Sequence, residues 1–324
     1  MKKGAKVLLI IAALLVLIGA VTVGFGLILA DGDFSKLSTF KYETNTYEIG
    51  EDFENIVIDT DTADIAFAKS EDGKCRVVLY ERENVKHSAT VKDGTLKIEE
   101  NDTRKWYEHI GINFTSPRIT VYLPKSEYAL LTVDGDTGDT EIPGVLSFGS
   151  IQVSVDTGDI NCFASVRENI GISTDTGDVF LDGVKASAIS ITTTTGDVYL
   201  SGVNATGGIS VNVTTGEIGI KNTTCGSFTS HGSTGDITLT DTVAYGILVI
   251  ERSTGEVKFN GADAAEIYVT TDTGDVDGSL LTDKVFIVKS DTGDIEVPRT
   301  QSGGRCEITT DTGDIEITVG RARN

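Results

Sequence analysis

The sequence contains the tripeptide Thr-Gly-Asp or Thr-Gly-Glu ten times, and the spacing of these copies constrains the fold more than any other feature. Their central glycines follow one another at intervals of 19 or 20 residues, at Gly138, Gly158, Gly177, Gly196, Gly216, Gly235, Gly255, Gly274, Gly293 and Gly313. A catalytic motif is usually present once, whereas a fixed period of about 20 residues is typical of a solenoid. The repeat therefore predicts architecture rather than an active site.

Apolar residues recur at fixed distances from each glycine. They stand seven and five residues before it and two and four residues after it, with the exceptions Ser230, Thr140 and Gly278. Alternation at period two predicts a strand that ends just before the glycine and another that begins just after it. The glycine then forms the corner, where a positive φ or a close backbone approach is expected.

A single repeat cannot bury its own apolar face, but stacked repeats can. We therefore predict an all-β fold, a single-chain parallel β-solenoid of about ten coils of 19–20 residues each, right-handed like other parallel crossovers. Coils spaced about 4.8 Å apart would form a rod roughly 48 Å long. The extra residue of each 20-residue coil is expected in the arc between its second strand and the next coil.

The N-terminus predicts an anchor. Residues 7–30 carry no charged side chain and follow Lys2, Lys3 and Lys6. This pattern is typical of a single transmembrane helix with a cytoplasmic basic tail, here residues 1–6, and an extracellular remainder. The alternative is a cleaved signal peptide that ends near Ala30. Residues 31–50 are interpreted as a polar juxtamembrane stalk.

Residues 51–130 contain a damaged copy of the repeat followed by an insertion. Ala63 stands where the glycine is expected, while Ile56, Ile58, Ile65 and Phe67 keep the apolar register. We interpret the insertion as a β cap over the first coil, because terminal repeats are usually atypical. Regular coils are predicted at 131–320 and a short tail at 321–324. The last coil is expected to leave an open strand edge.

Charge and cysteine content limit the partners and the chemistry. The formal net charge of −22 argues against nucleic acid and anionic headgroups as ligands. Cys162, Cys225 and Cys306 lie on coils too far apart for disulfides. We predict buried free thiols, and only Cys75 could find a partner in the cap.

The acidic residues of the repeat form the main candidate site. Stacking places one carboxylate per coil in a row, and like charges about 4.8 Å apart repel by roughly 0.9 kcal/mol even in water. Two interpretations are open: each Asp caps its own turn, or paired oxygens on adjacent coils bind Ca²⁺. The candidate calcium ligands are Asp136, Asp139, Asp156, Asp159, Asp175, Asp178, Asp272, Asp275, Asp291, Asp294, Asp311 and Asp314. No other cofactor is predicted.

Apolar residues at outward strand positions are candidate partner contacts. Six residues before their glycines, three successive coils carry Val249, Tyr268 and Ile287, and Phe180 and Tyr199 match across two earlier coils. Such stripes mark binding sites or stabilise neighbouring strands. The histidines share no motif with a nucleophile or a metal-ligand spacing, and no coil has a loop long enough to wall a cleft. The sequence therefore predicts a protein that is not an enzyme.

The Thr-Gly-Asp repeats, the Lys-rich anchor and the opening "YEIGEDFENIVIDTDTADIAF" resemble a bacterial family of adhesin-like β-strand-repeat proteins, a domain of unknown function. The resemblance covers roughly residues 50–320 and implies a bacterial cell envelope but no catalytic residues. It favours a membrane-anchored surface-binding or scaffolding module whose ligand is a protein or glycan. The alternative is an envelope-stress or signalling accessory that binds another membrane protein.

Overall fold

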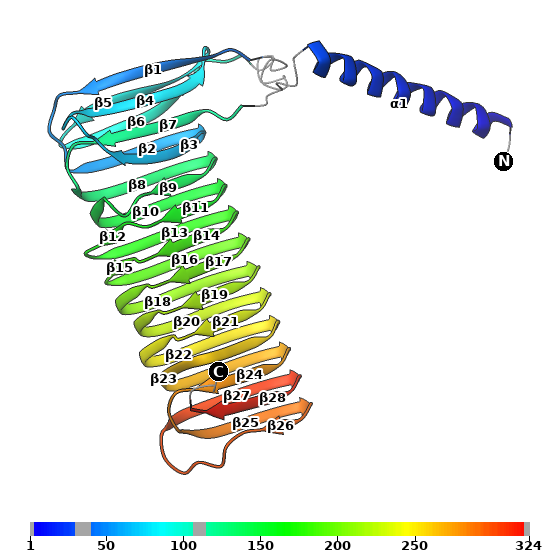
Figure 1. The fold of residues 1–324 in the computed structure, drawn as a ribbon, viewed down its shortest axis with the longest axis vertical. Coiled ribbons are helices and arrows are strands. Elements are labelled where there is room, and N and C mark those ends of the chain that lie inside the picture. Colours follow the sequence, from blue (N-terminus) through cyan, green and yellow to red (C-terminus); the bar gives the residue numbers. More distant parts are fainter. Residues whose placement is uncertain (1–2, 30–39, 106–114, 321–324) are drawn as a thin grey trace.

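The structure is a computed structural model that describes residues 3–29, 40–105 and 115–320. The predicted tail at 321–324 and part of the predicted stalk, 31–39, lie outside these ranges. One helix, α1 (Lys3–Leu29), precedes a body made of strands (Figure 1). Within the described residues, no helix meets the joint requirement of length and apolar character for a membrane span.

The body consists of two long sheets that face each other. In spatial order, sheet B contains β5 (Val85–Lys92), β6 (Thr95–Asp102), β2 (Asn55–Thr62), β8 (Glu127–Thr137), β10 (Ser147–Thr157), β12 (Ser165–Val166), β13 (Asn169–Thr176), β15 (Lys185–Ala186), β16 (Ala188–Thr195), β18 (Asn204–Thr215), β20 (Thr224–Thr234), β22 (Val243–Thr254), β23 (Val257–Thr273), β27 (Gly304–Thr312) and β25 (Lys284–Thr292). Sheet A contains β1 (Tyr42–Ile49), β4 (Cys75–Arg82), β7 (Arg118–Leu123), β3 (Asp64–Lys69), β9 (Thr140–Ile142), β11 (Ile160–Cys162), β14 (Val179–Asp182), β17 (Val198–Ser201), β19 (Ile218–Lys221), β21 (Ile237–Thr240), the start of β23, β24 (Val276–Leu280), β28 (Ile315–Val319) and β26 (Ile295–Glu296).

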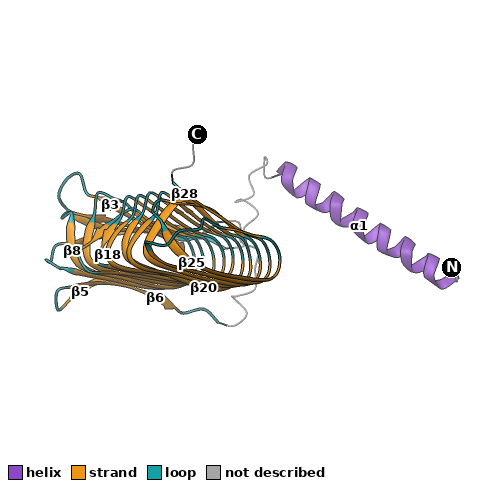
Figure 2. Cartoon of the chain, turned by 90° about the horizontal axis from the view of Figure 1, so that it is seen from below, coloured by secondary structure: helices purple, strands orange, loops and turns teal. Residues whose placement is uncertain are grey.

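The predicted solenoid of about ten coils is confirmed. We number the coils one to ten by their glycines in sequence order, from Gly138 to Gly313. Each coil crosses sheet B, turns at its glycine and returns through sheet A, and the view in Figure 2 looks along the resulting flattened tube. Equivalent residues pair in parallel from coil to coil, as in Ile172 with Ile191 and Leu181 with Leu200.

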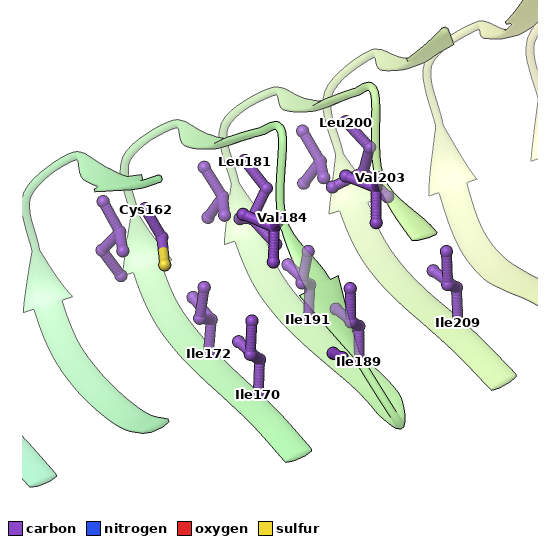
Figure 3. Close-up of a cluster of buried hydrophobic side chains, with 14 of the residues drawn as sticks. Cys162, Ile170, Ile172, Leu181, Val184, Ile189, Ile191, Leu200, Val203 and Ile209 are labelled. Carbon is purple, nitrogen blue, oxygen red and sulfur yellow. The ribbon is translucent and has the colours of Figure 1, made fainter. Parts of the chain in front are cut away.

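The apolar positions of the repeat line the interior between the sheets. Ile172, Leu181, Ile191 and Leu200 are all buried, and Figure 3 shows them stacked above their counterparts in adjacent coils. Because every coil contributes the same set, the core continues along the rod without a break between coils. The extra residue of the 20-residue coils lies in the predicted arc, where the pairing register shifts, for example between Ala205 and Gly208.

Antiparallel strands cover the N-terminal end of the stack. The damaged repeat forms a coil from β2 and β3, and Ala63 occupies the corner, where its amide donates to Thr137 O at 3.0 Å. Beyond it lie β6 and β7, which pair in parallel with β2 and β3. β5 and β4 then pair antiparallel with these two strands, and β1 with β4. This end of the rod is closed.

The stacking order departs from the chain order at the other end. β27 of coil ten pairs with β23 of coil eight on one side and with β25 of coil nine on the other. The final coil is therefore inserted between its two predecessors, and coil nine is outermost (Figure 1). The prediction that the last coil forms the open edge was wrong, because the open edge belongs to coil nine.

All four cysteines are free and buried, as the register predicts. Burial raises the pKa of Cys75 and Cys225 to about 11 and that of Cys162 and Cys306 to about 12. The thiols stay protonated at neutral pH, and this removes the thiolate that oxidation and alkylation require.

Candidate functional site

The ten repeat glycines lie directly above one another at one edge of the rod. All have positive φ, from 129° to 156°. A Cβ added to any of them would lie 2.0–2.2 Å from the carbonyl oxygen of the corner residue beneath. Both the backbone conformation and the lack of space therefore require glycine at the corner, which explains why this residue is kept in every full copy.

The acid after each glycine bonds to the neighbouring coil rather than to its own turn. Oδ1 of Asp159 accepts the amide of Asp178 at 2.8 Å, and Oδ1 of Asp178 accepts that of Asp197 at the same distance. The interpretation that each Asp caps its own turn was wrong, because these carboxylates accept a turn amide of the adjacent coil. These amide dipoles offset the repulsion between stacked carboxylates.

Two coils carry glutamate in place of aspartate, and the described bonds are interrupted there. The amides of Asp236 and Asp275 have no bond to the carboxylates of Glu217 and Glu256 beneath them, whereas Glu217 N itself donates to Asp197 Oδ1 at 2.8 Å. The extra methylene moves the carboxylate out of reach of the next amide. The coil-to-coil bond therefore requires the side-chain length of aspartate, and glutamate is too long.

The predicted calcium ligands do not converge in threes. Among the described residues, Asp61, Glu100 and Asp102 are the one acidic group whose oxygens all lie within 4.8 Å of one another, and none of the three belongs to the predicted set. In that cluster Glu100 already accepts the amide of Asp61 at 2.9 Å, and Asp102 forms an ion pair with Arg104 at 2.6 Å. Calcium binding at the repeat carboxylates stays a prediction.

One of the two predicted apolar stripes is interrupted. Val249 pairs with Tyr268, but the next residue in the stack is Glu307, and Ile287 lies beyond it. The prediction that Tyr268 and Ile287 are neighbours was wrong, because coil ten is inserted between their coils. The side chains around Tyr268 are charged, with Glu266 accepting its hydroxyl proton at 2.6 Å and Arg305 5.7 Å from the ring centre.

The second predicted pair, Phe180 and Tyr199, does lie on adjacent strands. Phe180 also contacts Phe163, which follows β11, edge-on at 5.9 Å between ring centres, so a third aromatic ring lies beside this pair. Partial burial, and after it the carboxylate of Asp197, raise the pKa of Tyr199, whose hydroxyl donates to Asp197 at 3.2 Å. This exposed aromatic row remains a candidate partner contact.

The outer face of sheet B carries a shallow groove of about 770 Å³ that sequence reasoning missed. Small outward residues form its floor in successive coils, among them Gly171, Ser190 and Ser210, with Gln152 at one side. When the repeats are aligned on their glycines, the outward residues six positions before the glycine are small in these coils. The sequence therefore contained a signal for this groove. We interpreted these outward residues only as polar or small and did not predict the groove that small side chains leave on the surface.

The sequence matches the family described as Toastrack DUF4097 over residues 53–242 and 209–323. The chain belongs to this family. The match confirms the predicted resemblance to a family of β-strand-repeat proteins of unknown function. A comparison with curated proteins gives no match.

Two solved structures are similar to this Toastrack chain. One is described as a "putative adhesin" from Bacteroides fragilis, with 19% identity, a TM-score of 0.45, and coverage of 86% of this chain and 97% of that one. The other is described as a "putative lipid binding protein" from Parabacteroides distasonis, with 14% identity, a TM-score of 0.49, and coverage of 87% and 98%.

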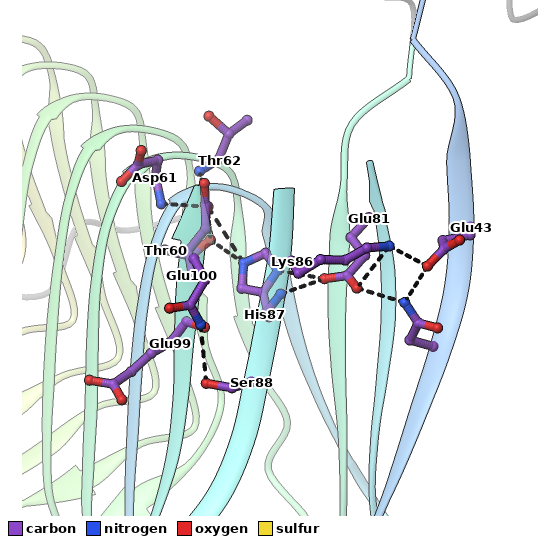
Figure 4. Close-up of polar contacts among 12 residues, drawn as sticks. Glu43, Thr60, Asp61, Thr62, Glu81, Lys86, His87, Ser88, Glu99 and Glu100 are labelled. Atoms are coloured by element: carbon purple, nitrogen blue, oxygen red, sulfur yellow. Dashed lines mark hydrogen bonds and ion pairs between the residues drawn. The ribbon is translucent and has the colours of Figure 1, made fainter. Parts of the chain in front are cut away.

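The cap of this Toastrack chain contains a buried polar network that sequence reasoning did not predict (Figure 4). The ring of His87 lies between Glu81 Oε2, 2.9 Å from Nδ1, and Thr60 Oγ1, 2.8 Å from Nε2. Thr60 also donates to Glu100 at 3.0 Å. The order hydroxyl–imidazole–carboxylate matches that of a nucleophilic triad, but Thr60 is 3% exposed and its proton is shared with Glu100. The network therefore joins the β5–β6 hairpin to β2 rather than offering a nucleophile to substrate.

Proposed function

We propose that this Toastrack protein is an extracellular rod, anchored in the cell membrane through residues 7–30, that binds a surface ligand or scaffolds other envelope components without catalysis. The observation that supports this proposal most is that the two ends of the rod differ. The chain enters the body at its closed end, where Phe40 leads into β1, while the other end is open. An anchor before residue 40 would hold the closed end near the membrane and direct the open end away from it.

The proposed anchor rests on sequence and exposure. Residues 7–30 contain no charge, and the side chains described in α1 are largely apolar and exposed, among them Leu15, Val16 and Ile28. A helix that is apolar on all sides is stable when protein or lipid surrounds it.

The absence of catalysis is proposed from the fold of the rod. The coils are joined by short turns and arcs, and the groove on sheet B is a shallow surface of small residues. The candidate contacts for a protein or glycan are the aromatic row that contains Phe180 and Tyr199 and the outer face around Val249 and Tyr268. The net charge of −22 disfavours nucleic acid as a partner.

Photo-crosslinking from the surface of intact cells tests the proposal. A photoreactive amino acid would replace Tyr199 or Tyr268, and biotinylation of intact cells would report whether the rod is outside. Crosslinks to a wall or host glycan support the surface-binding function, and crosslinks to a membrane protein support the accessory function instead. A rod protected from biotinylation, or Tyr199→Glu and Tyr268→Glu variants with unchanged binding and surface phenotypes, would contradict the proposal.

A further inference from the structure

The outermost coil leaves its part of the core uncovered. We call this coil, β25 and β26 with the residue after them, the tip. Its inward positions are Phe286, Val288, Ile295 and Val297, and Ile295 is 45% exposed while the other three are half-buried. The same positions in the coil beneath are at most 2% exposed, at Cys306, Ile308, Ile315 and Ile317. The tip therefore presents aliphatic side chains that every inner coil covers with another coil.

The tip also presents backbone groups that are paired in every inner coil. In coil eight, Gly274 N and Val276 N donate to carbonyl oxygens of the next coil in the stack, each at 2.9 Å. Their counterparts in the tip are Gly293 N and Ile295 N, and neither has an acceptor among the described residues. Asp294 occupies the ladder position whose Oδ1 accepts an amide in other coils. An edge of this kind is a template for another strand.

The tip carries little net charge, so it can approach a strongly acidic partner without strong repulsion. Lys284 is buried and paired with Asp263. The exposed side chains of residues 285–299 carry two positive charges, on Lys289 and Arg299, and three negative ones, on Asp291, Asp294 and Glu296, which gives a net charge of −1. The chain as a whole has a net charge of −22. Two copies that met along their sides would repel each other, whereas two tips meet with a net charge of only −1 on each surface.

From the open edge, the uncovered core and the low net charge, we propose that the tip binds the tip of a second copy of this chain. Identical edges pair through a two-fold axis, which makes the contact self-complementary and sets neighbouring strands antiparallel. The tips would cover each other's aliphatic side chains and pair each other's amides. If the closed end lies near the membrane, an orientation that rests on the proposed function, the contact joins rods from two facing membranes.

The size of the tip indicates a weak contact between single molecules. Nine residues of β25 extend about 30 Å, and the two sheets lie about 10 Å apart, so each tip buries about 300 Å². The total of about 600 Å² is below the 1,200–2,000 Å² of a stable complex. Many rods on facing membranes act together, however, and their avidity can exceed the single affinity by about 10²–10⁴. The contact suits reversible adhesion between surfaces.

Vesicle docking tests the inference with the full chain. The protein would be reconstituted into two populations of phosphatidylcholine vesicles that carry a donor and an acceptor dye, and energy transfer would report docking. The key variant is Ile295→Lys, which places a charge in the tip. The matched control is Ile247→Lys, because Ile247 is also 45% exposed but lies on the flank of the rod. Ile287→Lys is a second control, since its side chain is on the outer face of the same coil.

We expect wild type and both controls to dock and Ile295→Lys to dock at least tenfold less, with unchanged melting of all four proteins. Equal docking by Ile295→Lys, no docking by wild type, or docking of wild-type vesicles to protein-free vesicles would overturn the inference. Flotation of the vesicles tests the anchor separately. If the chain does not float with lipid, the proposed anchoring fails, and sedimentation equilibrium then decides on the tip: wild type must self-associate with rising concentration and Ile295→Lys must not.

Discussion

Arg252 is a cation inside the apolar tube, and replacing it should not destabilise the rod. It stands three residues before the corner of coil seven and is 3% exposed. Its Nη1 donates to Val213 O at 2.8 Å and its Nη2 to Ser230 Oγ at 3.2 Å, while Nε has no acceptor among the described residues. Gly232 makes room for it, because a Cβ there would lie 1.6 Å from Nη1.

Burial lowers the pKa of Arg252 to about 10. The ordinary value for arginine is about 12.5, so the difference of about 2.5 units corresponds to about 3 kcal/mol of disfavoured charge at pH 7. Arg252→Met keeps the length of the side chain and removes the charge, but it also loses two hydrogen bonds of about 1.5 kcal/mol each. The two contributions nearly cancel. We expect the free energy of unfolding at pH 7 to stay the same or to rise by up to about 2 kcal/mol.

The pH dependence separates this explanation from simple repacking. Since the pKa is lower in the folded protein, the unfolded chain binds more protons between about pH 10 and pH 12.5. Wild-type stability should therefore rise in this window relative to the variant, and any advantage of Arg252→Met at pH 7 should shrink as the pH passes 10.

Urea unfolding of wild type and Arg252→Met at pH 7 and pH 11 measures both effects. Arg305→Met is the control, because Arg305 lies on the outer face with its side chain 48% exposed, and it should match wild type apart from its surface ion pair. A loss of more than about 2 kcal/mol at pH 7, or a difference between Arg252→Met and wild type that does not change with pH, would refute the reasoning.

Four further predictions test the repeat. Gly177→Ala should destabilise the rod by more than about 4 kcal/mol by urea unfolding, because its φ is 150° and the new Cβ would lie 2.0 Å from the carbonyl oxygen beneath; a loss below 1 kcal/mol would contradict the corner geometry. Glu217→Asp should restore the missing ladder bond and raise stability by about 0.5–1.5 kcal/mol, and an unchanged melting curve would show that length is not the cause of the interruption. Cysteines at Tyr268 and Glu307 should form a disulfide on mild oxidation, whereas cysteines at Tyr268 and Ile287 should not, since one coil separates them; the reverse result would mean that the coils stack in chain order. Calorimetric titration with Ca²⁺ tests the carboxylate prediction, and the absence of both heat and a melting shift would remove it.

The coil could be predicted from the sequence because the stacking of coils requires both the corner glycine and the alternating apolar residues. Every inner corner glycine meets the backbone of its neighbour, so substitution is excluded at each copy, and the period survives. The alternating residues face one continuous core, so they stay apolar in almost all coils. The exceptions show the same rule: Ser230 and Gly232 depart from the pattern beside Arg252, whose guanidinium uses the space and the hydroxyl.

The candidate surfaces were harder to predict, because they depend on side-chain direction. The sequence placed the acids in a row but could not show that Asp178 bonds to the coil above rather than to its own turn. The cap network joins Thr60, Glu81, His87 and Glu100 from four strands, β2, β4, β5 and β6. No repeat relates these residues, and their pairing follows from how the β5–β6 hairpin packs on the first coil.

The insertion of coil ten shows that a sequence repeat does not determine the order in which its coils stack. Each coil specifies how it pairs with a neighbour, but almost identical coils do not specify which neighbour, so stacking in chain order and stacking with an exchange satisfy the same alignment. The discriminating residues lie outside the repeat. Gly303 precedes β27 and Gly304 is its first residue, and added Cβ atoms there would lie 1.9 Å from Asp283 O and 1.7 Å from Ala265 O. Two adjacent glycines thus leave room for coil ten between coils eight and nine. The buried ion pair of Lys284 with Asp263, at 2.5 Å, stabilises coil nine in the outermost position. The exchange has a consequence for function: the coil with little net charge, rather than the acidic final coil, becomes the exposed tip.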